Sequence, residues 1–309
     1  MNIIGRRRIW YLISLVLIVP GVIALFLWKM PMGIDFKGGT LLDIQYSKTT
    51  SKEQVQNGLN EAGIKNTNVQ ESGADFIIRT GNLDQTGQQN LEDALKKVGE
   101  YKQNRLETVG PTVSSDLKKK AIIAVVLASI AIIIYISIAF RKVPKPASSW
   151  RFGVCAVLAL IHDLVFVTGA FAIFGHFFGF EIDSLFITAL LTIMGFSVHD
   201  TIVVFDRIRE NLRRSPSLDF ETNVNNSILQ TLNRSLNTSF TVLIVLLALY
   251  LLGGQTLKHF MLALLLGIAI GTYSSIFNAS PLLVSWQLWS TRRLSRAREK
   301  VTSQRLPEA

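Results

Sequence analysis

The chain has 309 residues, with 32 lysines and arginines against 22 aspartates and glutamates, and a formal charge of +10. It is 49% apolar and only 17% charged, and its mean hydropathy is +0.34. Soluble chains have about a quarter of their residues charged, so this composition indicates a membrane protein and excludes disordered and collagen-like classes. A single cysteine, Cys155, also excludes a disulfide scaffold.

The first predicted element is a membrane span at Ile9–Trp28, preceded by Arg6, Arg7 and Arg8. A basic start before an apolar run is also typical of a secretory signal. This run is too long for a signal, however, and Lys29–Met32 offers no small-residue cleavage site. Residues 1–28 are therefore predicted to hold a cytoplasmic N-terminus and an uncleaved anchor.

Residues 29–118 are nearly neutral and predict a soluble domain outside the membrane. Alternating apolar residues indicate strands, and apolar residues three or four apart indicate helices. The expected order is a strand at Gly39–Tyr46, a helix at Ser51–Ala62, strands at Thr67–Glu71 and Ala74–Thr80, a helix containing Leu91, Leu95 and Val98, and a strand at Arg105–Val109. This βαββαβ order is the ferredoxin-like α+β arrangement, which by itself does not indicate a function.

Residues 119–286 contain five more apolar runs. Each is long enough to cross about 30 Å of hydrocarbon, which takes about 20 residues. They are Lys119–Phe140, Trp150–Gly175, Ser184–Phe205, Ser235–Leu252 and Phe260–Trp286. The fold class is thus an α-helical membrane protein with six transmembrane helices, a loop at 206–234 and a basic tail at 287–309.

The distribution of positive charge predicts the orientation. One set of flanks holds eighteen lysines and arginines, including Arg141, Lys142 and Lys145, whereas the short connections of the other set hold only Lys258. Because cytoplasmic flanks carry the excess of positive charge, both termini and the 206–234 loop are predicted to be cytoplasmic. The same charge favours contact with anionic lipid headgroups. No aromatic-interleaved basic patch supports nucleic-acid binding.

The sequence lacks most of the known catalytic motifs. Gly33–Thr40 resembles a phosphate loop, but the Gly-Lys-Ser/Thr ending is absent and no helix is predicted to follow directly. Neither a Gly-x-Ser-x-Gly nor a His-Glu-x-x-His motif is present, and the four histidines lack ligand spacing. We therefore expect no enzyme activity, no metal and no cofactor.

Ionisable residues within the predicted spans remain as the candidate site, because each costs at least a few kcal/mol there unless it is paired or faces a wet cavity. The candidate relay residues are Asp163, Asp200 and Arg234, with Ser197, His199, Asn237, Thr238 and Thr241 as their supporting polar residues. Asn278, Ser274 and Ser275 give the sixth span a similar polar stripe. His162 and His199 each directly precede an aspartate, so each is expected to point to a different helical face from its neighbour.

The depth of each residue in the membrane predicts which of these side chains meet. Asp200 and Arg234 lie near the same end of neighbouring helices, so a carboxylate to guanidinium pair is expected. One interpretation is a structural ion pair. The other is a proton relay, in which motion of Arg234 relative to Asp200 switches the proton affinity of the carboxylate. Asp163 is either a member of this relay or a partner in helix packing.

Several segments resemble one known family. They are Gly33–Thr40, Val109-Gly110-Pro111, His162-Asp163, Glu181-Ile182-Asp183, Gly195–Asn211, Arg234 with Asn237-Thr238-Ser239, and Leu249–Gly254. Across nearly the whole chain the sequence resembles the SecF subunits of SecD–SecF protein-export complexes, a branch of the resistance-nodulation-division (RND) superfamily. The Gly195–Asn211 segment is the most specific part of this resemblance.

The resemblance implies a six-span subunit of the RND-half type in the bacterial inner membrane, with a ferredoxin-like head outside the cytoplasm. It implies pairing with SecD beside the SecYEG channel, contact with the translocating polypeptide, and YajC and YidC as further candidate partners. Proton flow would then drive late steps of export, with protons as the coupling ion. Functional charge is implied at Asp200 and Arg234, with a further intramembrane aspartate supplied by SecD.

The sequence departs from the family at three places. His199 stands where the family usually has Asn, Phe196 stands where it has Tyr, and Val113-Ser114 stands where it often has Val-Gly. Two other functions stay open. One is an RND-type transporter of lipids or small solutes, and the other is a scaffold of the translocon that conducts no protons.

Overall fold

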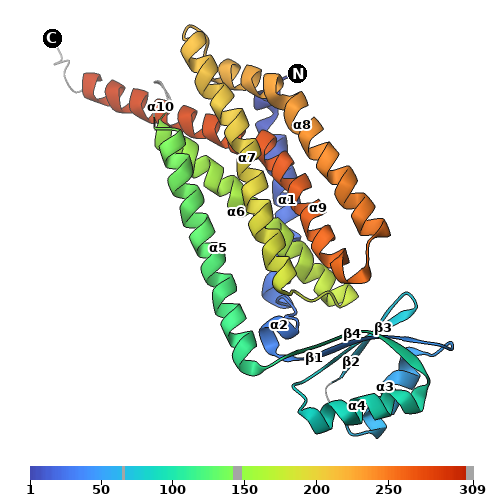
Figure 1. The fold of residues 1–309 in the computed structure, drawn as a ribbon. Helices are drawn as coiled ribbons and strands as arrows, with labels where there is room; N and C mark the ends of the chain where they lie inside the picture. Colours follow the sequence, from blue (N-terminus) through green and yellow to red (C-terminus); the bar gives the residue numbers. More distant parts are fainter. Residues whose placement is uncertain (65–66, 142–147, 304–309) are drawn as a thin grey trace.

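The computed structural model describes residues 1–64, 67–141 and 148–303 (Figure 1). A bundle of long helices carries a small α+β head at one end. The start of the first helix and the end of the last lie at the opposite end of the bundle. Lys142, Lys145 and Arg305, which contribute to the predicted charge asymmetry, lie outside the described residues.

The head consists of β1 (Gly39–Tyr46), α3 (Lys52–Glu61), β2 (Asn68–Ser72), β3 (Asp75–Thr80), α4 (Gln85–Val98) and β4 (Tyr101–Val109). Its sheet is antiparallel throughout, in the order β2-β3-β1-β4, so the ferredoxin-like prediction is confirmed. Two details differ. β4 begins at Tyr101 rather than Arg105, because its polar residues pair with β1 on an open face. The hairpin turn is Gly73-Ala74, where Gly73 adopts a φ of 68°.

Helices α3 and α4 cover the sheet face that points away from the bundle (Figure 1). Ser51 begins α3 with a capping box, in which it and Gln54 satisfy each other's backbone N–H groups. Between the helices and the sheet lies a core that includes Ile44, Leu59 and Ile78, all fully buried. The other sheet face is therefore free to meet the bundle.

The membrane bundle contains a 3-10 turn at Ile4–Arg6 followed by α1 (Arg7–Leu27), then α5 (Pro111–Ala139), α6 (Ser149–Phe178), α7 (Ser184–Arg214), α8 (Phe220–Leu252), α9 (Gln255–Ser274), a π turn (Ser275–Ala279) and α10 (Ser280–Ser303). Six of these helical stretches are long and apolar enough to cross a membrane, as predicted. A short helix, α2 (Ile34–Lys37), joins α1 to the head.

The predicted loop at 206–234 is wrong. Helix α7 continues to Arg214 and α8 begins at Phe220, so the connection shrinks to residues 215–219. Asp219 caps α8 by accepting from the Thr222 N–H, and Asn211 donates to Ser227 across the two helices. These polar contacts stabilise a helical hairpin beyond the apolar part of each span, where a hydropathy scan detects no signal. The last helix, α10, also runs on beyond the predicted sixth span, to Ser303.

Helices α1 and α6 cross in backbone contact at two glycines. A Cβ built on Gly169 would lie 2.6 Å from Cα of Gly21, and a Cβ on Gly21 would lie 2.9 Å from Cα of Gly169. Contacts this short leave no room for any side chain. Small residues allow such close approach in membranes, where packing rather than the hydrophobic effect holds helices together.

Candidate functional site

Asp163 on α6 is fully buried at the centre of a polar cluster. Its Oδ2 accepts hydrogen bonds from Ser197 Oγ on α7 at 2.5 Å and from Ser274 Oγ on α9 at 2.8 Å. Its Oδ1 lies 2.9 Å from Nδ1 of His162. Three helices thus converge on one carboxyl group, and two of its partners are uncharged hydroxyls.

Asp200 on α7 is 2% exposed and occupies a second polar position. Its Oδ2 accepts from Thr272 Oγ1 on α9 at 3.3 Å and from Ser239 Oγ on α8 at 3.4 Å. Those two hydroxyls are themselves 2.6 Å apart. Within the part of the chain that the structure describes, no lysine, arginine or histidine comes within 4.0 Å of this carboxyl group.

The expected pair between Asp200 and Arg234 is not formed in this structure. Arg234 on α8 is exposed and makes no ion pair with Asp200. The predicted supporting residues Asn237, Thr238 and Thr241 are exposed as well, and Thr241 Oγ1 donates only to the carbonyl of Thr238 on its own helix. They do not contact either aspartate.

The rotation of α8 explains this difference. Ser235 and Ser239 lie four residues apart on one face of the helix and are both 2% exposed, so this face packs inward. Arg234 precedes Ser235 by one residue and is therefore turned by about 100° away from that face. The residue of α8 that contacts Asp200 is Ser239, five residues beyond Arg234, so the position of Arg234 along the helix differs from the expectation as well as its direction.

The histidines differ from the prediction in one case. His199 is exposed, on a different face of α7 from the buried Asp200, as expected. His162, in contrast, contacts Asp163 with Nδ1 and Asn278 with Nε2. Its ring turns back toward the neighbouring carboxyl, because the π turn at Ser275–Ala279 places the Asn278 amide beside it.

Two residues of the site, Thr272 and Ser239, are missed by the sequence reasoning as partners of Asp200. Each is a small hydroxyl residue inside an apolar helix, which is a weak signal on its own. Ser239 follows Ser235 by one turn, and this four-residue spacing is the only pattern that points to it. Among the described residues, no three His, Cys, Asp or Glu side chains lie together in a way that could hold a metal ion.

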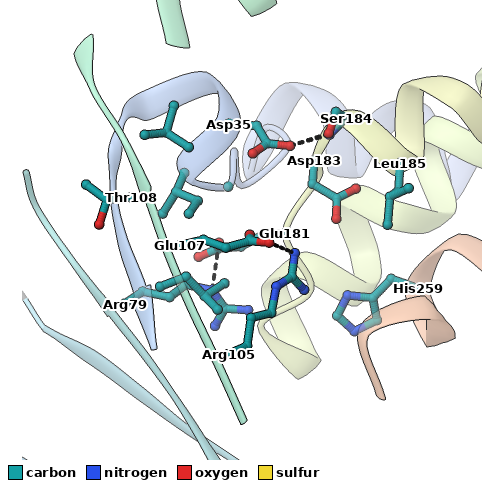
Figure 2. Close-up of a pocket in the computed structure, with 14 residues that line it drawn as sticks. Asp35, Arg79, Arg105, Glu107, Thr108, Glu181, Asp183, Ser184, Leu185 and His259 are labelled. Atoms are coloured by element: carbon teal, nitrogen blue, oxygen red, sulfur yellow. Dashed lines mark hydrogen bonds and ion pairs between the residues drawn. The ribbon is translucent and has the colours of Figure 1, made fainter. Parts of the chain in front are cut away.

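A pocket of about 590 Å³ separates the open face of the head sheet from the loop between α6 and α7 (Figure 2). Arg79 on β3 reaches across to Glu181, with Nε 3.0 Å from Oε2, and the side chains are only 11% and 19% exposed. Burial raises the pKa of Glu181 above its usual value, and the charges of Arg79 and Lys37 oppose this rise. The pair is therefore one anchor of the head on the bundle.

A second anchor lies at Asp35 in α2. Its Oδ2 accepts from the backbone N–H of Ser184 at 2.8 Å and from the Ser184 hydroxyl at 2.5 Å. Asp183, the N-cap of α7, accepts from the N–H of Phe186. The head side of the chain thus supplies a capping group to the helix that carries Asp200. A parallel bridge between Met32 and Ile182 continues this contact.

We predict that reversing the charge of Arg79 releases the head from the bundle. Arg79→Glu places two carboxylates together in a mostly buried contact, which is strongly destabilising. Amide hydrogen exchange in β3 and in the loop at 179–183 should rise at least about tenfold, as a local loss of about 1.4 kcal/mol requires. The double variant Arg79→Glu, Glu181→Arg should restore protection.

The matched control is the exposed pair Glu92–Lys96 on α4, whose side chains are 43% and 63% exposed. Lys96→Glu should leave exchange at the junction unchanged, since exposed pairs contribute little. Equal effects of Arg79→Glu and Lys96→Glu would show that the Arg79–Glu181 pair does not anchor the head.

Comparison with known proteins agrees with this architecture. Residues 90–289 match the family described as protein export membrane protein SecD/SecF, C-terminal, and residues 28–50 match the SecD/SecF GG motif. The chain is 48% identical to protein translocase subunit SecF of Thermobaculum terrenum, over 97% of this chain and 98% of that protein. It is 42% identical to SecF of Anaerolinea thermophila, over 93% and 94% respectively.

Solved structures show the same fold. The crystal structure of SecDF, a translocon-associated membrane protein from Thermus thermophilus, matches with a TM-score of 0.84 and 34% identity over 93% of this chain. The chain spans 38% of the length of that SecDF chain. SecDF in a super-membrane-facing form matches with a TM-score of 0.68 and 33% identity. The chain therefore belongs to the SecD/SecF family of protein-export membrane proteins, on its SecF side.

Proposed function

We propose that this chain works with SecD to use the proton motive force for late steps of polypeptide export through SecYEG. The observation that carries the proposal is the burial of Asp163 and Asp200 between transmembrane helices, where hydroxyl groups are the main partners. A carboxylate costs at least a few kcal/mol at this depth, so such residues are rare unless they take part in function.

Energetics support protons as the coupling ion. One elementary charge that moves through 100 mV releases about 2.3 kcal/mol. A tenfold shift of a two-state equilibrium requires about 1.4 kcal/mol. Proton uptake and release at a single aspartate can therefore bias a conformational change strongly, whereas a group that keeps its charge in every state gives no such bias.

Arg234 enters the proposal through motion of α8. It lies five residues before Ser239 on α8 and faces outward, and a rotation of α8 would bring its long side chain toward the carboxyl group in another state of the cycle. Ser239 would leave Asp200 in the same movement, so the carboxyl would exchange hydroxyl partners for a cation. That exchange lowers the proton affinity of Asp200 and releases its proton.

The head is the element that such a change would move. Asp35 caps α7 at one end, and Asp200 lies farther along the same helix. A shift of α7 is therefore passed to the head through short hydrogen bonds rather than through a flexible linker. We propose that the head contacts the translocating polypeptide, and that SecYEG, YajC and YidC are further partners.

We place the chain in the bacterial inner membrane with both termini in the cytoplasm and the head outside it. The start of α1 and the end of α10 lie at the end of the bundle opposite the head (Figure 1). The basic flanks of the predicted spans belong to this end of the bundle. The positive-inside rule then assigns this end to the cytoplasm. Contact with anionic lipid headgroups follows from the same charges.

The proposal is tested by export of a preprotein into inverted vesicles that contain this chain with its SecD partner. Export should rise several-fold when a proton gradient is imposed after ATP has been removed. An equal rate with and without the gradient would favour a scaffold. Gradient-dependent movement of a small solute or lipid without a preprotein would favour an RND-type transporter instead.

A further inference from the structure

His162 lies between two buried polar groups. Its Nδ1 is 2.9 Å from Oδ1 of Asp163, and its Nε2 is 3.0 Å from Nδ2 of Asn278. Its side chain is 12% exposed, whereas that of Asp163 is fully buried. The imidazole is therefore the more accessible member of this pair.

The hydrogen-bond partners fix which nitrogen of His162 carries a proton. When Asp163 is ionised it only accepts, so Nδ1 then carries the hydrogen that it donates to Asp163. The NH₂ of Asn278 only donates, so Nε2 must be the unprotonated nitrogen. The amide is held in this orientation by Ser14 on α1, whose hydroxyl donates to Oδ1 of Asn278 at 2.8 Å. One direction of donation thus runs from Ser14 to Asp163.

This series of hydrogen bonds ends at Ser14 and Tyr273, whose two hydroxyl oxygens have no hydrogen between them. Ser14 Oγ and the Tyr273 hydroxyl are 3.3 Å apart, but Ser14 already donates to Asn278. Tyr273 donates to the backbone carbonyl of Trp10 at 2.8 Å. No proton is therefore left to lie between the two oxygens while His162 is neutral.

Proton uptake at Nε2 reverses this order. A protonated Nε2 must donate, so the Asn278 amide has to rotate and present Oδ1 to it. Nδ2 then faces Ser14, and the Ser14 hydroxyl turns toward Tyr273, where the empty contact accepts it. A single proton at His162 therefore rearranges hydrogen bonds as far as α1.

We propose that His162 is the proton-accepting residue that loads Asp163, and that Asn278 is its positioning residue. In the transfer step an Nε2–H bond forms with the incoming proton, the Nδ1–H bond breaks, and an Oδ1–H bond forms on Asp163. His162 is left neutral with its hydrogen on Nε2, and Asp163 is left protonated. This inference rests on the proposed proton-coupled function and names the residue that feeds it.

The position of Asn278 connects this step to the rest of the fold. It lies in the π turn Ser275–Ala279, and such turns are frequent at functional sites. Its partner Ser14 lies on α1, which leads toward the head through the bridge between Met32 and Ile182. A change at His162 thus reaches both the bundle and the segment that enters the head.

Few other ionisable groups surround His162. Asp163 is on its own helix, and the Tyr273 ring on α9 lies against it with centroids 6.5 Å apart. Asp200 on α7 and Tyr11 on α1 bond to other partners, Thr272 with Ser239 and Ser285 respectively. The two polar groups in contact with the His162 nitrogens are therefore the Asp163 carboxyl and the Asn278 amide.

The test is nitrogen NMR of the full chain, labelled with ¹⁵N-histidine and reconstituted in lipid vesicles with its SecD partner. Subtracting the spectrum of His162→Gln assigns the signals of this residue among the four histidines. In the wild type at neutral pH, Nδ1 should be protonated and Nε2 should not. Asn278→Asp places a carboxylate, which only accepts, beside Nε2, so in this variant Nε2 should carry a hydrogen at the same neutral pH.

Two further variants separate this role from simple packing. Ser14→Ala removes the group that orients the amide, so both neutral tautomers of His162 should appear. Ser285→Ala is the matched control, since it removes a hydrogen bond of 2.9 Å between Tyr11 on α1 and α10 without touching the His162 chain. Its His162 signals should be those of the wild type.

A wild-type His162 with its hydrogen on Nε2 at neutral pH would overturn the inference, as would identical nitrogen spectra of His162 in Asn278→Asp and Ser285→Ala. These failures differ from failure of the proposed function. If export depends on the gradient but the His162 spectrum contradicts the prediction, only the proposed role of His162 is excluded. If export does not depend on the gradient, the proposed function is excluded, whatever the His162 spectrum shows.

Discussion

Asp200→Asn should reduce gradient-driven export and proton flux to the background of vesicles without this chain. Asparagine keeps the shape of the side chain and can still accept from Thr272 and Ser239, so packing of α7 should survive. It cannot gain or lose a proton, and the bias of about 2.3 kcal/mol per 100 mV disappears. The expected loss is at least about tenfold.

The matched control is Asp206→Asn on the same helix. Asp206 is 55% exposed and pairs with Arg209 one turn away, so its charge is in contact with solvent. Removing it should leave proton flux within about twofold of wild type, because exposed pairs are worth at most about 1 kcal/mol. Both variants should still purify with the SecD partner. Full activity of Asp200→Asn would contradict the proposed relay.

Gly169→Val should separate α1 from α6 and strongly destabilise the bundle. The added Cβ would meet the backbone of Gly21, which cannot move aside as a flexible side chain would. Overpacking a tight contact costs about 1–3 kcal/mol, and this backbone contact belongs at the upper end of that range. The expected result is a lower unfolding temperature in detergent and poor recovery of the folded chain. Gly21→Val should behave in the same way.

Gly195→Val provides the control for this effect. Gly195 lies within the span of α7, and a Cβ added there would meet nothing within 4 Å. Both substitutions make the same chemical change within a membrane helix, so they differ only in what the new side chain meets. Similar unfolding temperatures for Gly169→Val and Gly195→Val would show that the α1–α6 crossing is looser than described.

The sequence was sufficient for the architecture because the signals behind it are periodic. Apolar length predicted the six spans, and alternation in segments such as Leu42–Tyr46 predicted the head strands. The extent of α7 and α8 beyond the membrane was missed, because a helix with charged residues outside the apolar layer looks like a polar loop. Contacts in the structure, such as the hydrogen bond from Asn211 to Ser227, show that this region is a helical hairpin.

The residue types of the candidate site were predictable, but the directions of the side chains were not. The cost of a carboxylate in a membrane marked Asp163 as a candidate, and Ser197 was expected to support Asp200, whereas the structure joins Ser197 to Asp163 by a hydrogen bond of 2.5 Å. The rotation of α8 depends on how Ser235 and Ser239 pack, which is a property of the whole bundle. The sequence therefore predicted the Asp200–Arg234 pair that this structure does not form. The contact of His162 with Asn278 lies at the π turn Ser275–Ala279, which has no sequence signal.

The central claim, that Asp200 exchanges a proton as the protein works, is tested most directly by infrared difference spectroscopy of vesicles carrying the complex. A change of pH across its working range should produce the C=O stretching band of a protonated carboxylic acid, and Asp200→Asn should remove one component of that band. Asp206→Asn should leave the band intact. A spectrum that is the same in wild type and Asp200→Asn would mean that this carboxyl group keeps its proton state throughout, which contradicts the account.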